Sequence, residues 1–486
     1  MSKYLKKILE YSANTFFNKL LLLMLLPLFT KWLIPEEYAI YTNLLVFTSF
    51  ASLVYMLGQQ QTVFSYFYYK KTDEYHFTYI SSIFITIIFV GIVLSLLVIL
   101  FRHELSIFVL RTSKYSHLFI PISIVLFCDV LLGLTLSILN IMEKSSSYFK
   151  IGIIKNTIFF LFVLSCIFIE GFSIERVFIF LAISSFVSAL CGLISIRKIL
   201  NRLSCIQENK SYFSLSLIKR LLAFGIIMIP ATLAMISLRL SDRWMLTYFS
   251  PNSLYDVGIY AVGYKMGMII TIVNSLVSLV FFPYAMKLKD SNSTKKVFKK
   301  IFNYYVLFGG FIGMIIVIFA PEIFQLVIDK TYFSAVKLVI FGVASNFLLG
   351  IYSIINLGLY MKHKAMNITT AVAIGAVSNL ILNFFLIPTF GVNGAGYASI
   401  IAYLIIVVFN YYSSKKVFPV KYKIEYAFIV LLCLITMSYI TCLLPVTWVI
   451  FIVKLVIIFF ISCMIFKYIV KSNDKILIKK LFVQKY

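Results

Sequence analysis

The stretch LRLSDRWMLTYFSPNSLYDVGIYAVGYKMG, residues 238–267, contains five charged side chains. Asp256 lies in the predicted loop, and the other four lie within or beside two long apolar runs. These four are Arg239, Asp242, Arg243 and Lys265. A charge near the middle of a bilayer is expensive, so each of these residues needs a reason to be there. Arginine suits bidentate contacts with phosphate or carboxylate, and lysine supplies a point charge. Together such side chains can hold an anion.

Helical spacing indicates which of these side chains can meet. Arg239 and Arg243 are four residues apart and share a helix face, and Asp242 can pair with Arg239 and lower the cost of burial. The alternative is an ion pair at an outer helix end. Lys19 lies roughly 12 Å inside the first apolar run, a long reach for a side chain that would extend to the headgroups. We predict a cationic cavity lined by Lys19, Arg239, Arg243 and Lys265, with Asp242 as supporting partner.

Other charges in the runs have simpler explanations. Asp129 lies in the middle of a run, where a carboxylate can carry H⁺ or Na⁺ or can pair with a cavity lysine, and both readings stay open. Lys155, Lys337 and Lys454 lie near the ends of runs and are predicted to extend to the headgroups. The seven cysteines show no paired spacing, so neither a disulfide framework nor a metal site is expected.

Two groups of uncharged polar residues also interrupt the runs. Asn379 and Asn383 are four residues apart, a spacing that favours hydrogen bonds to a neighbouring helix, with a sugar as the alternative partner. The glutamines at 59–61 stand at the end of a run. They either line the mouth of a cavity or form a solvated helix end.

The elements that position these residues are membrane helices. The chain of 486 residues is 62% hydrophobic and 13% charged, whereas soluble domains are nearer half and a quarter. Apolar segments of about 20 residues without strand-like alternation predict an all-α polytopic membrane protein. Its first run is expected to be an uncleaved span. Fourteen helices are predicted, at 11–34, 38–58, 79–101, 118–140, 151–170, 176–196, 218–241, 256–284, 301–320, 334–360, 366–388, 393–414, 424–444 and 447–468.

Lysine and arginine set the orientation. The N-terminus and every second loop hold most of the 44 basic residues, and the opposite loops carry several acids. Both ends are therefore predicted to face the cytoplasm. The formal charge of +26 then faces the anionic cytoplasmic leaflet, and no nucleic-acid partner is expected. The outer loop 102–114, which contains Arg102, Arg111 and Lys114, is an exception that topology does not explain.

The two halves of the chain resemble each other. FRHELSIFVLRTSKYS (101–116) lies over FAPEIFQLVIDKTYFS (319–334), and EEYAIY (36–41) over YDVGIY (255–260), at an offset of about 218 residues. Such a repeat predicts two six-helix bundles related by a pseudo-twofold axis along the membrane normal, a transporter architecture. The predicted units are an N-lobe at 1–200, a cytoplasmic linker at 201–217, a C-lobe at 218–414, and helices 13–14 with a basic cytoplasmic tail at 415–486.

Three segments resemble a known family. SNLILNFFLIPTFGVNGAGYASIIAY (378–403) resembles the helix 11–12 signature of the polysaccharide-transporter branch of the MOP exporters (multidrug, oligosaccharidyl-lipid and polysaccharide exporters). SDRWMLTYFSPNSLYDVGIYAVGYKMG (241–267) is similar to its helix 7–8 stretch, and LIPEEYAIYTNLL (33–45) to its first loop. The resemblance covers essentially the whole chain. It implies two six-helix lobes around a cationic cavity, with Arg239, Arg243 and Lys265 as cavity cations and Lys19 opposite.

The same resemblance implies an O-antigen or capsule repeat-unit flippase of the bacterial cytoplasmic membrane. Its cargo would be an oligosaccharide linked to undecaprenyl pyrophosphate. Membrane lipids would be partners, as would the glycan polymerase and chain-length proteins of the same pathway. No cofactor is expected apart from coupling to H⁺ or Na⁺, and the resemblance does not support Asp129 in that role.

Rival functions remain. A cation-coupled exporter of small molecules should carry several acids in its spans, but Asp129 is the clear case. A flippase for a lipid-linked peptidoglycan precursor has the same architecture. A membrane glycan polymerase or ligase needs a substantial outer loop, whereas the outer loops here are short. We therefore expect a transporter and not an enzyme.

Overall fold

The computed structural model describes residues 3–67, 73–166, 172–204, 211–275, 277 and 292–471. These residues are mainly helical and include no β-strand. The long helices are α1 (Lys3–Trp32), α2 (Pro35–Met56), α4 (Asp73–Leu100), α6 (Phe119–Ile141), α7 (Ser145–Ser165), α8 (Ile174–Ser204), α9 (Leu215–Phe249), α10 (Ser253–Gly267), α12 (Asn292–Ile318), α14 (Val339–Met361), α15 (Ala365–Phe390), α16 (Val392–Val417), α17 (Ile424–Leu443) and α18 (Trp448–Lys471). The shorter elements are α3 (Gln59–Tyr66), α5 (Arg102–Leu110), α13 (Ala320–Val327), η1 (Ser116–Leu118) and η2 (Lys330–Leu338).

Each of the fourteen predicted runs corresponds to one long helix. In the described ranges, twelve helices are long and apolar enough to cross a membrane. The other two predicted runs correspond to α10, which has 15 residues, and to α18. The run predicted at 256–284 continues past α10 as helical residues 270–275, and most of its remainder lies outside the described residues. The prediction of an all-α polytopic protein is confirmed.

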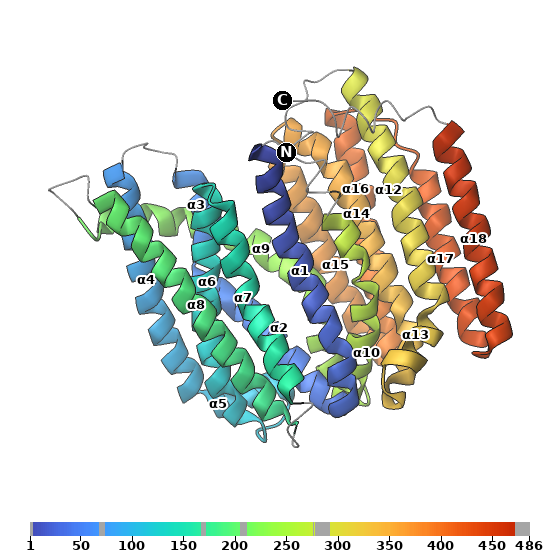
Figure 1. Cartoon of the computed structure of the whole chain (residues 1–486), viewed down its shortest axis with the longest axis horizontal. Helices are drawn as coiled ribbons and strands as arrows, with labels where there is room; N and C mark the ends of the chain where they lie inside the picture. The colour runs from blue at the N-terminus through green and yellow to red at the C-terminus, as the bar shows by residue number, and fades with distance from the viewer. Residues whose placement is uncertain are drawn as a thin grey trace.

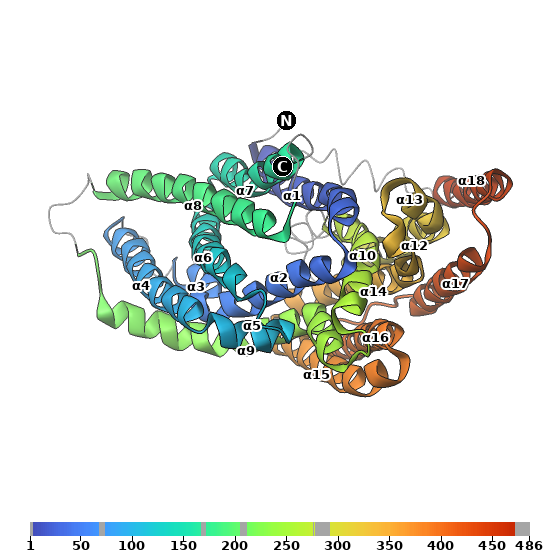
Figure 2. The same cartoon turned by 90° about the horizontal axis from the view of Figure 1, so that it is seen from below.

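The long helices form two groups. Figure 1 shows α4 to α8 on one side and α12 to α18 on the other, with α1 between them. Helix α1 packs against α7, and α2 packs against α10. Seen from below, α2 and α10 lie near the middle of the molecule (Figure 2). Residues of α1, α2, α9 and α10 therefore stand where the two groups meet.

Helix α9 packs against both groups. It contacts α3 and α4 on one side and α15 and α16 on the other, and Figure 2 shows it running from beside α4 toward α15. A Cβ placed on Gly58 would lie 2.2 Å from the carbonyl oxygen of Gly225 in α9, and Gly58 has a φ of 70°. Only glycine fits such a left-handed turn under a crossing helix. The predicted start of the C-lobe at residue 218 falls near the beginning of this shared helix.

The internal repeat reappears in the order of the elements. Helix α4 is followed by α5, η1 and α6, and α12 by α13, η2 and α14. The two short helices follow Phe101 and Phe319, the residues that the sequence alignment matched. The same arrangement of a short α-helix followed by a 3-10 helix thus occurs twice, at the end of the molecule that is predicted to face outward. We call this the outer end.

The two groups touch at the outer end. A Cβ placed on Gly258 of α10 would lie 2.0 Å from the carbonyl oxygen of Pro35, so these backbones pack without an intervening side chain. Arg111 follows α5 and donates a hydrogen bond of 3.2 Å to the carbonyl oxygen of Tyr248 in α9. Its guanidinium also lies 5.1 Å from the centre of the Tyr248 ring. This contact gives one of the unexplained outer cations a structural partner.

Candidate functional site

Two of the predicted cations share a cavity. A cavity of about 160 Å³ lies between α2, α9 and α10, and Arg243, Lys265 and Tyr38 are among its lining residues. The Arg243 guanidinium lies 5.6 Å from the centre of the Tyr264 ring, and Lys265 Nζ lies 3.4 Å from the Tyr38 hydroxyl. Aromatic faces attract cations without neutralising them. We call this space the cation cavity.

Both cations lack a carboxylate partner in the described part of the chain. Arg243 is only 8% exposed, and its guanidinium donates a long hydrogen bond of 3.5 Å to the carbonyl oxygen of Arg239. Lys265 is partly buried and close enough to Arg243 for the two charges to repel each other. Two like charges in a small cavity are stabilised when an anion enters it.

Lys19 of α1 contacts the segment that follows α10. Its Nζ donates hydrogen bonds of 3.0 Å to the carbonyl oxygen of Thr271 and 2.6 Å to the Ser275 hydroxyl. On the same helix, Asn14 and Asn18 donate to backbone carbonyls of α7. Helix α1 is thus bound to α7 by its amides and to the segment after α10 by its lysine.

The remaining predicted cation, Arg239, is exposed. Its charge and that of Lys19 are close enough to repel each other. Neither of these two residues lines the cation cavity. The structure therefore places Arg243 and Lys265 in one cavity, while Lys19 and Arg239 lie outside that cavity.

Asp242 does not form the predicted ion pair within the described residues. Its side chain is buried, and its carboxylate accepts hydrogen bonds of 2.8 Å from the Tyr260 hydroxyl and 2.8 Å from Asn383 Nδ2, and another from the Ser399 hydroxyl. Asp242 and Arg239 have the right spacing to pair, but the carboxylate turns toward α10, α15 and α16. Asn379 accepts from Ser241 at 3.0 Å, so the interpretation of these asparagines as helix-packing residues is confirmed.

Two lysines that were predicted to reach the headgroups are paired inside the protein instead. Lys155 Nζ lies 2.5 Å from Asp129 Oδ2, and Lys454 Nζ lies 2.6 Å from Glu322 Oε1. Lys454 is only 4% exposed. Lys454 lies near the start of α18, whereas Lys155 lies in the middle of α7 and not at a helix end. Each binds an available carboxylate where burial removes the competing water. The alternative in which Asp129 pairs with a lysine therefore holds, although that lysine is Lys155 and not a lysine of the cation cavity.

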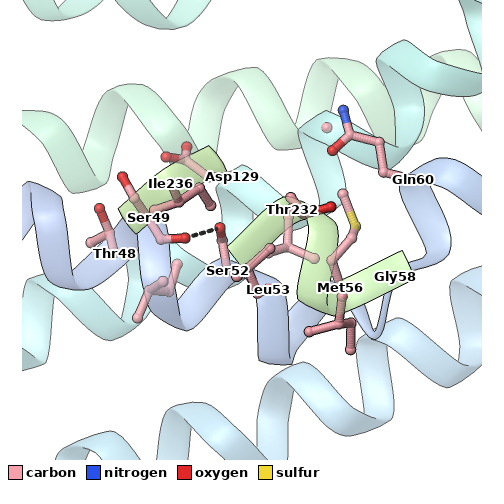
Figure 3. Close-up of a pocket in the computed structure, with 14 residues that line it drawn as sticks. Thr48, Ser49, Ser52, Leu53, Met56, Gly58, Gln60, Asp129, Thr232 and Ile236 are labelled. Atoms are coloured by element: carbon pink, nitrogen blue, oxygen red, sulfur yellow. Dashed lines mark hydrogen bonds between the residues drawn. The ribbon is translucent and has the colours of Figure 1, made fainter. Parts of the chain in front are cut away.

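A second cavity of about 300 Å³ lies between α2, α3, α6 and α9 (Figure 3). It shares Ser49 with the cation cavity, so the two spaces follow each other along α2 and α9. We call it the hydroxyl cavity, after its polar lining of Thr48, Ser49, Ser52, Gln60, Asp129 and Thr232. The glutamine run thus lines a cavity through Gln60.

Sequence reasoning missed the hydroxyl cavity. Its signal was present in the segment TSFAS at 48–52, where Thr48, Ser49 and Ser52 mark one face of an apolar helix. Tyr38, which contacts Lys265, is part of the segment EEYAIY that the internal repeat matches. No role in a site was predicted for it. No group of histidine, cysteine, aspartate and glutamate in the described residues could hold a metal ion.

Comparisons with known proteins agree with this architecture. The family model for polysaccharide biosynthesis proteins matches residues 4–289, more than half of the chain. An uncharacterized membrane protein of Methanocaldococcus jannaschii, MJ1068, is 24% identical over 330 residues. That match covers 65% of this chain and 61% of the archaeal protein, so the chain spans about three fifths of this relative's length.

Solved structures share the fold. Lipid II flippase MurJ in an inward closed conformation superimposes with a TM-score of 0.77 at 17% identity, over 95% of this chain and 99% of MurJ. A multidrug resistance MATE transporter of the MOP superfamily in an inward-facing conformation gives a TM-score of 0.59 at 12% identity, over 83% of this chain and 94% of that one. The chain therefore belongs to the polysaccharide biosynthesis protein family and has the fold of the MOP superfamily transporters.

Proposed function

We propose that this protein is a flippase that moves a polyprenyl-pyrophosphate-linked oligosaccharide, such as an O-antigen or capsule repeat unit, across a bacterial cytoplasmic membrane. The head of this cargo would pass from the cytoplasmic to the outer face by alternating access between the two groups of helices. The lipid tail can remain in the bilayer, whereas the pyrophosphate and the sugars need a polar path. In this proposal, the cation cavity and the hydroxyl cavity form part of that path.

The observation that carries this proposal is the pair Arg243 and Lys265. Both line the same cavity, and neither has a carboxylate partner in the part of the chain that the structure describes. A pyrophosphate would supply the missing negative charge, with the guanidinium contacting two oxygens and the ammonium a third. Binding that relies on only two cations would also be weak enough to allow release.

The comparisons support a lipid-linked cargo. The neighbour MurJ is named a lipid II flippase, and the family is described by polysaccharide biosynthesis. The family therefore favours an oligosaccharide over a peptidoglycan precursor. An exporter of organic cations is disfavoured, because Asp129 has an internal counter-charge and Asp242 accepts three hydrogen bonds. Glycan polymerase and chain-length proteins remain proposed partners.

Coupling to H⁺ or Na⁺ stays a prediction. Its candidate, Asp129, is balanced by Lys155 at 2.5 Å in this conformation. A carboxylate with an internal counter-charge does not need a bound cation. If Asp129 takes part in coupling, Lys155 must first move away from it.

Deletion of the gene in its source strain tests the proposal. We expect loss of surface glycan and accumulation of lipid-linked oligosaccharide on the cytoplasmic face. Plasmid copies with Arg243→Met or Lys265→Met should fail to restore export, while Lys337→Met should restore it because Lys337 is exposed and outside the cavity. Normal glycan export in a deletion strain without a second flippase would refute the proposed function.

A further inference from the structure

The two adjoining cavities differ in the chemistry of their walls. The cation cavity has Arg243 and Lys265 in its lining and no carboxylate. The hydroxyl cavity has the Asp129 carboxylate and no lysine or arginine in its lining. Phosphate oxygens match the first wall better than the second, which offers no cationic side chain in its lining. A single ligand can therefore fill both cavities only if one of its parts is an anion and the adjoining part is an uncharged donor of hydrogen bonds.

The hydroxyl cavity presents hydrogen-bond acceptors. Thr48 and Ser49 each donate a hydrogen bond of 2.8 Å to the carbonyl oxygen of Leu45, and Ser52 donates one of 2.8 Å to the carbonyl oxygen of Ser49. A hydroxyl whose hydrogen is committed to its own helix offers only its lone pairs to a ligand. Figure 3 shows Ser49 and Ser52 side by side on α2 with Thr232 near them.

Asp129 adds a stronger acceptor to this wall. Its Oδ2 is held by Lys155, its Oδ1 is buried without a hydrogen-bond partner in the described part of the chain, and 35% of the side-chain area is exposed. A carboxylate accepts hydrogen bonds from hydroxyl groups more strongly than a neutral oxygen does. Lys155 neutralises its charge from α7, so the wall attracts hydroxyl and amide donors without attracting free cations.

The size and position of this cavity also match one kind of ligand part. Its volume of about 300 Å³ lies at the lower end of the range for small-molecule sites, about 300–1,000 Å³. Ser49 lines both cavities, so a group in one is next to a group in the other. A sugar joined directly to a phosphate has this arrangement of a donor-rich ring beside an acceptor-only anion.

We propose that the hydroxyl cavity is a sugar subsite that binds the first uncharged sugar of the cargo, next to the pyrophosphate in the cation cavity. This inference rests on the proposed function and assigns different parts of the cargo to the two cavities. The cations set the affinity for the pyrophosphate. Thr48, Ser52 and Asp129 accept hydrogen bonds from the hydroxyl and amide groups of the sugar.

The test compares two probes that differ by one sugar and by one negative charge, and this charge difference is the same for every protein variant. Farnesyl pyrophosphate and the same lipid carrying one N-acetylglucosamine on its pyrophosphate are titrated against the purified full-length protein in detergent, by calorimetry. In the unmodified protein, the sugar should tighten binding about tenfold, the effect of one or two well-made hydrogen bonds. The measured quantity is the ratio of the two dissociation constants.

The decisive variant removes two acceptors and keeps the fold. Thr48→Val with Ser52→Ala should reduce the sugar's contribution to less than about threefold and leave farnesyl pyrophosphate binding unchanged. The matched control is Thr436→Val with Ser165→Ala, because these residues make the same hydrogen bonds three residues back, to Cys433 and Phe162, away from the cavity. Thermal unfolding of both double variants shows that each one is folded.

Two results separate this inference from the proposed function. If Lys265→Met weakens both probes while the sugar's contribution survives in the Thr48, Ser52 double variant, the sugar subsite is wrong and the proposed function stands. If neither probe binds the unmodified protein, the proposed function itself fails. A sugar that contributes nothing in the unmodified protein, with farnesyl pyrophosphate still bound, also overturns the subsite.

Discussion

Charged side chains inside the spans fall into two kinds. Lys454 is buried beside Glu322 at 2.6 Å, in the contact between α18 and α13. Arg243 and Lys265 are also largely removed from water, but they contact aromatic rings, a hydroxyl and a backbone carbonyl, and no carboxylate in the described ranges. The first kind is internally neutral, and the second is not.

The difference indicates which charges serve the fold and which serve a ligand. A buried ion pair gains nothing from an outside ion, and removing one partner leaves an uncompensated charge. An unpaired cation makes the empty protein less stable and the occupied protein more stable. Stability and transport should therefore respond in opposite ways to substitutions in the two regions.

The internal repeat sharpens this contrast. Glu104 of α5 and Glu322 of α13 occupy matched positions, yet Glu104 is exposed and Glu322 is 6% exposed. The C-terminal helix α18 contributes Lys454 beside Glu322, whereas Glu104 forms no ion pair within the described residues. The same acid is thus a surface residue in one copy and an internal ion-pair partner in the other.

The largest expected effect on stability is at the buried pair. Lys454→Met should lower the free energy of unfolding by about 3–5 kcal/mol, because Glu322 is left charged and buried. Thermal unfolding in detergent measures the change. Glu322→Gln combined with Lys454→Met should recover most of it, and Glu104→Gln should have no effect. An unaltered unfolding temperature in Lys454→Met would contradict the comparison.

A smaller loss is expected at the second pair. Lys155→Met should cost about 1–2 kcal/mol, between the values for exposed and buried pairs, because the two side chains are 17% and 35% exposed. The same unfolding assay applies. The double variant Asp129→Asn, Lys155→Met serves as the control. A loss as large as that of Lys454→Met would mean that exposure does not distinguish the pairs.

The smallest effect on stability is expected in the cation cavity. The free energy of unfolding of Lys265→Met should lie within about 0.5 kcal/mol of that of the unmodified protein, or exceed it, because the substitution removes a repulsion from Arg243. Export of the glycan should nevertheless be lost in the complementation assay. If Lys265→Met strongly destabilises the protein, Lys265 serves the fold and not a ligand.

The sequence was enough to predict the helices and to single out several candidate site residues. Hydropathy located fourteen runs because each span must satisfy its backbone within itself and cover its surface with apolar side chains. Helical spacing predicted that Arg239 and Arg243 share a face, but only Arg243 lines the cation cavity. The chemistry of lysine singled out Lys265, which lines the same cavity. The repeat offset matched the two segments that form α5 and α13, but it did not predict that these segments are helical, and 102–114 was expected to be an outer loop.

Spacing along one helix could not predict which distant side chain is the partner. Asp129 and Lys155 are 26 positions apart, and Glu322 and Lys454 are 132. Asp242 could have paired with Arg239 by local geometry, but α15 and α16 brought Asn383 and Ser399 to it instead. The sequence determined which segments cross the membrane and which charges they carry, because those properties belong to each helix alone. Only the tertiary structure decided which charges are neutralised, because that depends on how helices far apart in the chain pack together.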